Sequence, residues 1–208
     1  MKNKKIFFKK SKALLIKKKK QKFTFIIDDI NLSNLKKDEV VIKVIYTCFN
    51  FKDILIGKGN PGLVRNYPHV PGIDCTGKVY YSNSNKFKKG DNVMVIARPS
   101  GVNSFGTMSN YFVSPSKWIE KIPPKMNMKT PIIFGTAGFT AMLAVQNIIK
   151  NKINKNFPIL VTGATGGVGL ISIFFLNNLG YKITAATTNV KKNYNFLKKM
   201  GVKRIIDL

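Results

Sequence analysis

Residues 161–169, with the sequence VTGATGGVG, are the most informative segment of the chain. They follow an apolar run from Phe157 and open the apolar, helix-forming segment 168–179, which is the context of a dinucleotide-binding turn. Glycines let the backbone turn sharply and approach a pyrophosphate, and the start of a helix supplies unpaired N–H groups. A turn that serves folding alone remains the alternative. We predict that the turn binds a cofactor through Gly163, Gly166, Gly167, Val168 and Gly169.

The segments on both sides of this turn alternate between strand-like and helix-like patterns. A helix-forming segment, 136–149, precedes it. A strand-like segment at 181–187, a helical segment at 194–200 and a further strand from residue 204 follow it. The order β-α-β-α-β predicts a parallel sheet of the Rossmann type with right-handed crossovers.

The first part of the chain differs, because short strand-like runs alternate there with turns that contain Gly and Pro. Many short strands of this kind predict a small barrel or sandwich over about residues 12–122. We expect strands at 13–16, 23–27, 39–46, 72–81, 93–96, 105–113 and 118–122. The predicted fold class is therefore mixed α/β, with a basic extension at 1–11, a barrel domain at 12–125 and part of a nucleotide-binding domain at 126–208.

The composition excludes several classes of protein. The chain has 208 residues, of which 44% are hydrophobic, and this argues against a disordered basic tail. No window holds 18 consecutive apolar residues, so we predict no transmembrane helix and no membrane partner. The two cysteines are too few for a disulfide-dense scaffold or a four-thiolate zinc module. Residues 1–23 lack the apolar centre of a secretory signal, so we expect a cytoplasmic protein.

The formal net charge of +27 raises the question of a nucleic-acid partner. All but three of the 36 basic residues are lysines, and arginine is the residue that reads guanine edges and clamps phosphates. Lys, Asn, Ile and Phe are all abundant and share A/T-rich codons. We therefore attribute most of the charge to codon drift and expect no specific nucleic-acid partner; a basic nucleic-acid-binding protein remains an alternative.

The residues after the second predicted strand of the sheet indicate which cofactor the turn binds. An NAD-specific site places Asp or Glu there for the ribose hydroxyls, and this chain has neither. It has Thr188 and Asn189 instead, followed by Lys191 and Lys192. Hydroxyls and cations suit a 2′-phosphate, so we predict NADPH. The alternative is that the two lysines belong to the general lysine excess.

Four motifs in one order resemble a known family. They are NFKD at residues 50–53, PGID at 71–74, GTAGFTAM at 135–142 and the glycine-rich turn. Together they resemble the zinc-independent, quinone oxidoreductase-like members of the medium-chain dehydrogenase/reductase superfamily. Within this group the sequence is most similar to acryloyl-CoA reductases, which also have an Arg-Asn-aromatic-Pro run like residues 65–68 here.

The resemblance implies a GroES-like barrel followed by a Rossmann domain, and NADPH-dependent reduction of an activated carbon–carbon double bond, as in acryloyl-CoA or a related enoyl thioester. It implies that Asn50 and Phe51 lie beside the nicotinamide as catalytic residues, and that Phe51 and Thr136 contact the cofactor. Acryloyl-CoA reductases have Tyr at the position of Phe51, so an acid role there is in doubt. A core aromatic is the alternative for Phe51.

The same resemblance gives no support for a metal. Zinc-dependent relatives have Cys where this chain has Asn50, and His shortly after the Pro-Gly step, where this chain has Ile73 and Asp74. Cys48, Cys75 and His69 do not have a familiar zinc-ligand spacing. We expect no metal, and we expect both cysteines to be small hydrophobic residues in strands.

The chain ends at Leu208, in the third strand of the predicted sheet, whereas relatives continue well beyond this point. A half sheet would leave its first strand with a free edge. We therefore expect a truncated and impaired enzyme, with a homo-oligomer or a complementing C-terminal fragment as partner. A quinone oxidoreductase and a non-catalytic remnant or subunit remain alternatives.

Overall fold

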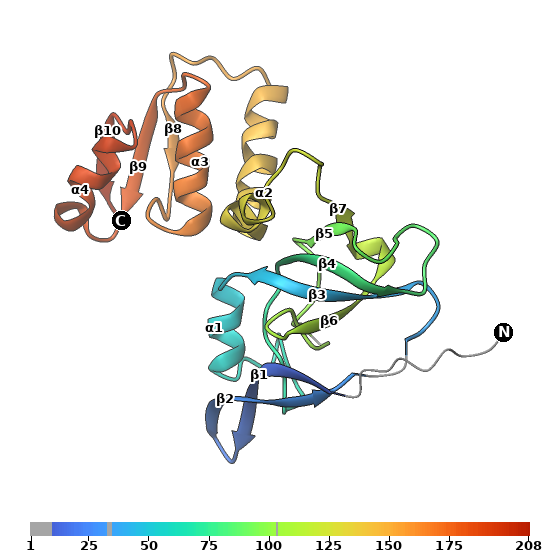
Figure 1. The fold of residues 1–208 in the computed structure, drawn as a ribbon. Coiled ribbons are helices and arrows are strands. Elements are labelled where there is room, and N and C mark those ends of the chain that lie inside the picture. Colours follow the sequence, from blue (N-terminus) through green and yellow to red (C-terminus); the bar gives the residue numbers. More distant parts are fainter. Residues whose placement is uncertain (1–9, 33–34, 103) are drawn as a thin grey trace. The chain divides into compact units, whose positions relative to one another are not determined.

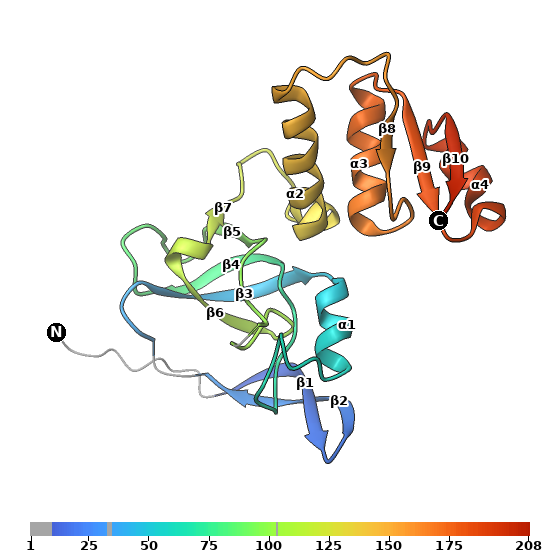
Figure 2. The ribbon, with the colours of Figure 1, turned by 180° about the vertical axis from the view of Figure 1, so that it is seen from behind.

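The computed structural model describes residues 10–32, 35–102 and 104–208. The chain forms two compact units, of which the first ends at Gly135 and the second runs from Thr136 to Leu208. Figures 1 and 2 show the strands of antiparallel sheets in the first unit and the alternating helices and strands of the second. The predicted fold class, mixed α/β with antiparallel sheets followed by a parallel sheet, is therefore confirmed. The predicted domain boundary at residue 125 stays a prediction.

The first unit starts with a long β-hairpin. Strand β1 (Lys10–Lys19) pairs with β2 (Lys22–Asn31) around a turn at Lys20, whose φ is 54°. The expected strands at 13–16 and 23–27 are the centres of these longer strands. β1 begins inside the segment that we assigned to a basic extension, of which residues 1–9 lie outside the described residues.

A five-stranded antiparallel sheet makes up the rest of the first unit's strands. Its order is β6-β3-β4-β5-β7, and a short 3₁₀ helix, η1 (Ser116–Trp118), precedes its last strand. The sheet buries an apolar core in which Val, Ile and other strand-forming residues predominate. The strands are β3 (Glu39–Thr47), β4 (Cys75–Ser82), β5 (Asn92–Val95), β6 (Tyr111–Pro115) and β7 (Glu120–Lys121).

The prediction of one strand over residues 105–113 is wrong in its first half. Only the part from Tyr111 is a strand, because the backbone at 106–108 bonds to a loop instead. The amides of Gly106, Thr107 and Met108 donate to the carbonyls of Val70, Gly72 and Pro71, at 2.7, 2.9 and 3.1 Å. A Cβ at Gly106 would lie 2.3 Å from the Gly72 oxygen. The glycine thus permits a close contact between two backbone segments, and this contact replaces strand pairing.

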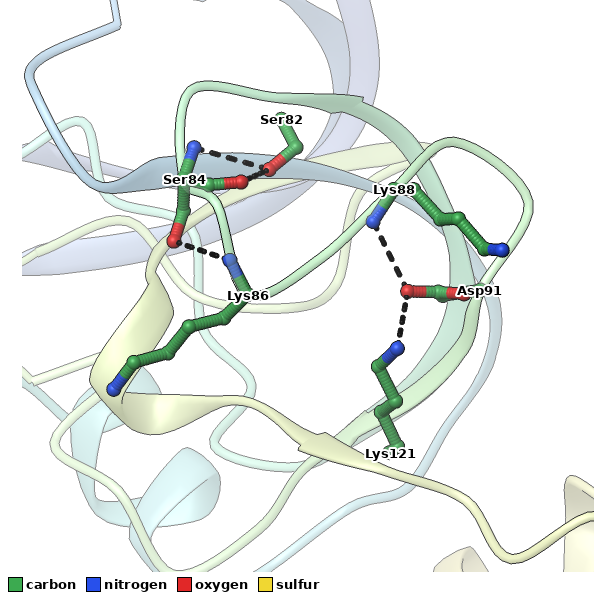
Figure 3. A network of polar contacts seen from close by, with 6 residues as sticks. All are labelled: Ser82, Ser84, Lys86, Lys88, Asp91 and Lys121. Carbon is green, nitrogen blue, oxygen red and sulfur yellow. Dashed lines mark hydrogen bonds and ion pairs between the residues drawn. The ribbon is translucent and has the colours of Figure 1, made fainter.

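Figure 3 shows how the loop between β4 and β5 is closed. The Asp91 carboxylate accepts from the backbone N–H of Lys88 at 3.0 Å and from Nζ of Lys121 on β7 at 2.9 Å. Ser82 and Ser84 bond to one another on the opposite side of the loop. The carboxylate therefore ties the loop to the edge strand, and both bonds lower the pKa of Asp91.

A short helix that the sequence analysis did not predict, α1 (Phe51–Gly57), follows β3. Its first turn contains Asp53, whose Oδ2 accepts from the backbone N–H of Asn50 at 2.7 Å. Ile56 of this helix is fully buried, with Ile16 of the hairpin and Val64 in the same core cluster. The helix therefore holds the first of the four sequence motifs in a defined position.

Helix α2 (Lys129–Lys150) contains a break at Gly135, where φ is 53° and ψ is −156°. The predicted helix at 136–149 is the part that follows the break. Among the residues that the structure describes, α2 is the one helix long and apolar enough to span a membrane, judged by length and composition alone. Its continuous part after Gly135 is shorter than the about 20 residues that a span requires.

The second unit is built on a three-stranded parallel sheet with the order β10-β9-β8. Its core joins both intervening helices to the sheet, through Ile173 and Leu176 of α3, Ile183 of β9 and Leu197 of α4. Since the helices fall between the strands in sequence, the predicted β-α-β-α-β order is confirmed. The elements are β8 (Ile159–Val161), α3 (Gly167–Asn178), β9 (Ile183–Thr187), α4 (Val190–Lys199) and β10 (Arg204–Asp207).

Candidate functional site

The glycine-rich turn connects β8 to α3 in the second unit. Gly163 has a φ of 56°, in the left-handed region that favours glycine. Its carbonyl accepts from the N–H of Gly166, the N-cap of α3, at 2.9 Å, and the N–H of Ala164 donates to Ala186 O of β9 at 3.2 Å. The turn is thereby fixed to the neighbouring strand.

The two sides of the turn differ in the space that they leave. A Cβ at Gly169 would lie 2.3 Å from Gly163 O and 2.9 Å from the Ala164 Cα, so a side chain has no room on the inner side. A Cβ at Gly163 would meet nothing within 4 Å. The first amides of α3 have no acceptor within the helix, as at any helix start. The outer side of the turn thus offers open space and N–H donors, which fits a pyrophosphate.

A hollow of about 460 Å³ lies beside this turn within the second unit. It is bordered by residues of α2, β8 and α3, and these include all five residues of the turn predicted to bind a cofactor. Those five are Gly163, Gly166, Gly167, Val168 and Gly169. The structure brings them together at one end of β8.

The end of β9 carries the other predicted cofactor residues. β8 and β9 are parallel neighbours, with Val161 opposite Ala185, so their carboxyl ends lie at the same edge of the sheet. Asn189 caps α4, since its Oδ1 accepts from the N–H of Lys192 at 3.0 Å. Thr188, Asn189, Lys191 and Lys192 are all exposed. The structure therefore places these four at the edge where the glycine turn lies.

Asn193 is a residue that the sequence analysis missed at this edge. Its Nδ2 donates to Thr187 Oγ1 at 3.2 Å and to Asn189 O at 2.9 Å, so it fixes the end of β9 against the start of α4. An asparagine in the first turn of a predicted helix was the available signal, but the helix was predicted to begin at residue 194 and begins at Val190.

A second group of polar residues lies in the first unit, where two sequence motifs meet. Asp53 joins them, because its Oδ1 accepts from the N–H of Gly72 at 2.8 Å and its Oδ2 accepts from the N–H of Asn50. Burial raises the pKa of Asp53, and the two backbone bonds act in the opposite direction. Residues 50–53 and 71–74 therefore form one structural element.

Asp74 is the fully buried centre of this group. Its Oδ2 accepts from Asn50 Nδ2 at 3.1 Å and lies 3.7 Å from Cys48 Sγ, and its Oδ1 accepts from the Ala97 N–H at 3.3 Å. Burial, followed by the charge of Asp74, raises the pKa of the Cys48 thiol to about 12. We call Cys48, Asn50 and Asp74 the Asn50 cluster.

The sequence analysis gave no role to Asp53 or Asp74. Both lie inside the motifs that it quoted, and the chain has only 9 acidic residues. A carboxylate among buried apolar residues is costly unless it is hydrogen-bonded, so acidic residues in such motifs were the signal for a polar cluster. Only the tertiary contact reveals which donors they bind.

The other predicted site residues have separate positions. Phe51 is 72% exposed, so the alternative that it is a core aromatic is wrong. Thr136 opens the second unit, and its carbonyl accepts from Thr140 Oγ1 at 2.8 Å. In the Arg-Asn-aromatic-Pro run, Arg65 and Asn66 are exposed, and the Tyr67 hydroxyl donates to Ile56 O of α1 at 3.0 Å. The assignment of Phe51 and Thr136 to the site stays a prediction.

The potential metal ligands are engaged in other contacts. Within residues 10–32, 35–102 and 104–208, no three His, Cys, Asp or Glu side chains form a group that could hold a metal ion. His69 Nε2 lies 2.8 Å from Gly101 O, and Cys75 is fully buried at the start of β4. Cys48 corrects one expectation, because it is half-buried and follows β3 instead of lying in a strand.

Comparison with known proteins agrees with this architecture. Residues 36–124 match the alcohol dehydrogenase GroES-like domain. The chain is 39% identical over 181 residues to "Putative quinone oxidoreductase YhfP" of Bacillus subtilis, and 37% identical over 182 residues to acrylyl-CoA reductase AcuI of Ruegeria pomeroyi. Each alignment covers 86% of this chain and 54% of the relative, so the chain spans about half the length of these relatives.

Solved structures give the same result. The yhdH oxidoreductase of Salmonella enterica, in complex with NADP, aligns with a TM-score of 0.87 at 30% identity, over 94% of this chain and 60% of its own. The structure of YhfP with NAD bound aligns with a TM-score of 0.86 at 37% identity, over 95% and 60% of the two chains. The four ordered motifs, the GroES-like domain and these relatives agree. Over most of its length the chain is therefore similar to quinone oxidoreductases and acrylyl-CoA reductases, and residues 36–124 carry their GroES-like domain.

Proposed function

We propose that this chain takes part in NADPH-dependent reduction of an activated carbon–carbon double bond, with acryloyl-CoA or a related enoyl thioester as the substrate. The observation that carries the proposal is the glycine-rich turn, with its open outer side at the carboxyl ends of β8 and β9. A relative named acrylyl-CoA reductase supports the substrate class. A Rossmann-type role for the second unit and a cytoplasmic location remain part of the proposal.

The residues of the second unit suit the phosphates of a dinucleotide. The amides at the start of α3 would hold the pyrophosphate, and Thr188, Asn189, Lys191 and Lys192 would hold a 2′-phosphate. When bound, NADPH supplies the hydride that adds to the β-carbon of the enoyl thioester. Phe51 is exposed but has no hydroxyl, so it can pack against a planar ring and cannot donate a proton.

The cofactor is tested by titrating the chain with NADPH and with NADH, with nicotinamide fluorescence as the readout. Replacing Lys191 and Lys192 by Ala should weaken NADPH binding about tenfold, because two cations near the 2′-phosphate are lost, and should leave NADH binding unchanged. The matched control replaces Lys198 and Lys199, at the other end of α4. An equal loss in both variants would show that only the general positive charge matters, and no binding of either nucleotide would contradict the proposal.

Quinone reduction is the second candidate, because a relative 39% identical is named as a quinone oxidoreductase. NADPH oxidation measured with acryloyl-CoA and, separately, with a benzoquinone distinguishes the two. Faster turnover of acryloyl-CoA supports the first proposal, and faster turnover of the quinone supports the second. Binding of NADPH with neither activity would favour a non-catalytic subunit.

A further inference from the structure

The amide of Asn50 has a defined orientation in the Asn50 cluster. Its Nδ2 is 3.1 Å from Asp74 Oδ2 and 3.7 Å from Cys48 Sγ, which accounts for both of its N–H groups. The opposite amide orientation would place the Asn50 oxygen 3.1 Å from a carboxylate oxygen, with no hydrogen between two acceptors. Both donors of Asn50 are therefore used inside the cluster. Its Oδ1 accepts from the Asp53 N–H in a capping box, so what the amide can still offer a ligand is the second lone pair of that oxygen.

Asp74, which imposes this orientation, is itself held from several directions. Its carbonyl accepts from the hydroxyls of Thr47 and Thr107, each at 2.8 Å, and its Oδ1 accepts from Ala97 N–H. A Cβ at Gly135 would lie 2.8 Å from Asp74 Oδ2, so the carboxylate also fills the space beside the break in α2. The two threonine bonds fix the Asp74 backbone, and the Ala97 N–H and the close packing at Gly135 hold the carboxylate toward the Asn50 amide.

We propose that Asp74 is a positioning residue that turns the Asn50 amide so that it offers a ligand an acceptor and no donor. The proposal about the ligand rests on the function proposed above. In that reaction, a carboxamide N–H or a hydroxyl can bind to Asn50, whereas the oxygen of an enolate or thioester cannot. Asn50 therefore orients a donor group, and the charge that develops on the substrate oxygen is stabilised elsewhere.

Cys48 reports on this arrangement without any ligand. Its thiol donates to the same Asp74 oxygen and accepts from Asn50, so its ionisation depends on where the carboxylate is. Burial is the largest cause of its raised pKa, Asp74 is the next, and Asp53 contributes as well; Cys75 is the other titratable group nearby. The rate of Cys48 alkylation by iodoacetamide, followed by peptide mass spectrometry between pH 8 and 10, measures that ionisation.

Three variants of the full chain give different expected rates. Asp74→Asn removes the carboxylate, and Cys48 should react about tenfold faster, which corresponds to a fall of about one pKa unit. Asn50→Asp places a second carboxylate beside the thiol, and Cys48 should react more slowly. The exchange Asn50→Asp/Asp74→Asn restores one donor amide and one carboxylate, and the rate should return to within about threefold of the unchanged chain.

The control is Asp91→Asn, the same chemical change at the surface loop of Figure 3, which should leave Cys48 unaffected. Cys75 is an internal control, because it is fully buried and stays unlabelled while the first unit is folded. A Cys48 rate in Asp74→Asn equal to that in Asp91→Asn overturns the proposal. If Asp74→Asn unfolds, the exchange variant decides: restored protection of both cysteines supports the proposal, and continued labelling of both overturns it.

NADPH titration of the exchange variant then tests the ligand. Residue 50 would be a carboxylate, which only accepts, so a donor group on the ligand should still bind within about threefold of the unchanged chain. A loss of binding above tenfold in a folded exchange variant would show that the ligand needs a donor at residue 50. If the unchanged chain binds no NADPH, the proposed function and the choice of ligand fail, whereas the contacts of Asp74 and Asn50 with the Cys48 thiol are still tested by the alkylation rates.

Discussion

The two units of the chain contain similar apolar cores but differ in how their sheets end. In the first unit, the edge strand β6 is partly covered, because the N–H of Tyr111 donates to Ser11 Oγ of the hairpin at 3.0 Å. In the second, β8 is the outermost strand of the described sheet, and Leu160 on it is 55% exposed. Phe157, just before β8, is 67% exposed. The first unit thus partly covers its edge at β6, and the described sheet of the second unit has an apolar edge at β8.

The two units also differ in the surroundings of their predicted sites. The Asn50 cluster lies in the first unit, with Asp74 fully buried and Cys48 and Asn50 half-buried. The residues of the second unit that are predicted to bind a nucleotide are backbone amides and exposed side chains at strand ends. We therefore expect the first site to respond to changes in its hydrogen bonds, and the second to respond to changes in backbone packing.

The largest effect is expected for Gly169→Ala. Its new Cβ would meet the backbone at Gly163 and Ala164, which cannot move aside as a side chain would, so we expect a loss of about 2–3 kcal/mol in the second unit. Gly167→Ala is the control on the same helix, since its Cβ would lie at an ordinary 3.4 Å from Ala137. Hydrogen exchange should show weaker amide protection in β9 and unchanged amide protection in β4.

Equal losses of protection in β4 and β9 would contradict the separation into two units. The reciprocal change is Gly77→Ala, whose Cβ would lie 2.2 Å from Lys43 O of the neighbouring strand. It should weaken protection in the first unit by a similar amount and leave β9 unchanged. Together the two variants measure how far the units unfold independently.

A smaller effect is expected at the edge of β8. An exposed apolar strand edge favours pairing with other chains, so residues 1–208 expressed alone should associate as their concentration rises. Phe157→Lys/Leu160→Lys should reduce that association several-fold in sedimentation velocity. Ile27→Lys, at a residue 76% exposed in the first unit, is the control. If Ile27→Lys reduces association as much as the double variant does, then association does not depend on the edge of β8.

A pH effect should distinguish the first unit from the second. Burial lowers the pKa of His69 below its ordinary 6.5, and its bond to Gly101 only partly offsets this. The unfolded chain therefore binds a proton before the folded one does, and stability should fall as pH decreases from about 6.5 toward the lowered pKa. The stability of His69→Gln, measured by thermal unfolding, should not fall in this way as pH decreases. An unchanged pH dependence would mean that other groups cause it.

The smallest effect is expected for Asp91→Asn. Its bond to Lys121 lies at the surface, where an ion pair contributes about 1 kcal/mol or less and is screened by salt. Asn can still accept from the Lys88 amide, so the loop should keep its form. Urea unfolding should show that the variant is slightly less stable than the unchanged chain at low salt and equally stable at high salt. A loss above about 2 kcal/mol in the free energy of unfolding would mean that Asp91 binds Lys121 of β7 more strongly than a surface ion pair does.

The sequence predicted the alternating elements of the second unit well, because each of them carries a local signal. An apolar helix-forming run, glycines and strand-forming residues indicate β8, α3 and β9 within their own segments. Family resemblance added the GroES-like domain, which the comparisons bear out. Charge and composition added little, since most lysines are solvated surface residues.

The sequence could not predict features that depend on contacts between distant segments. The strand expected at 105–113 fails because Gly106 packs on Gly72, which lies over thirty residues away. The inward amide of Asn50 depends on Asp74 in the same way. Helix α1 is short and has a weak pattern of its own, and its position is set by the bonds of Asp53. The roles assigned to site residues remain predictions.

Gly135 has a consequence for how this chain can change over evolutionary time. The residue at which one unit ends has no room for a side chain, because the carboxylate of Asp74 fills that space. The same carboxylate orients Asn50. A mutation that gave residue 135 a side chain would have to be accompanied by a change at residue 74, and thus by a change in the polarity of the Asn50 cluster. Residues 50, 74 and 135 should therefore be inherited together, as a single unit of selection.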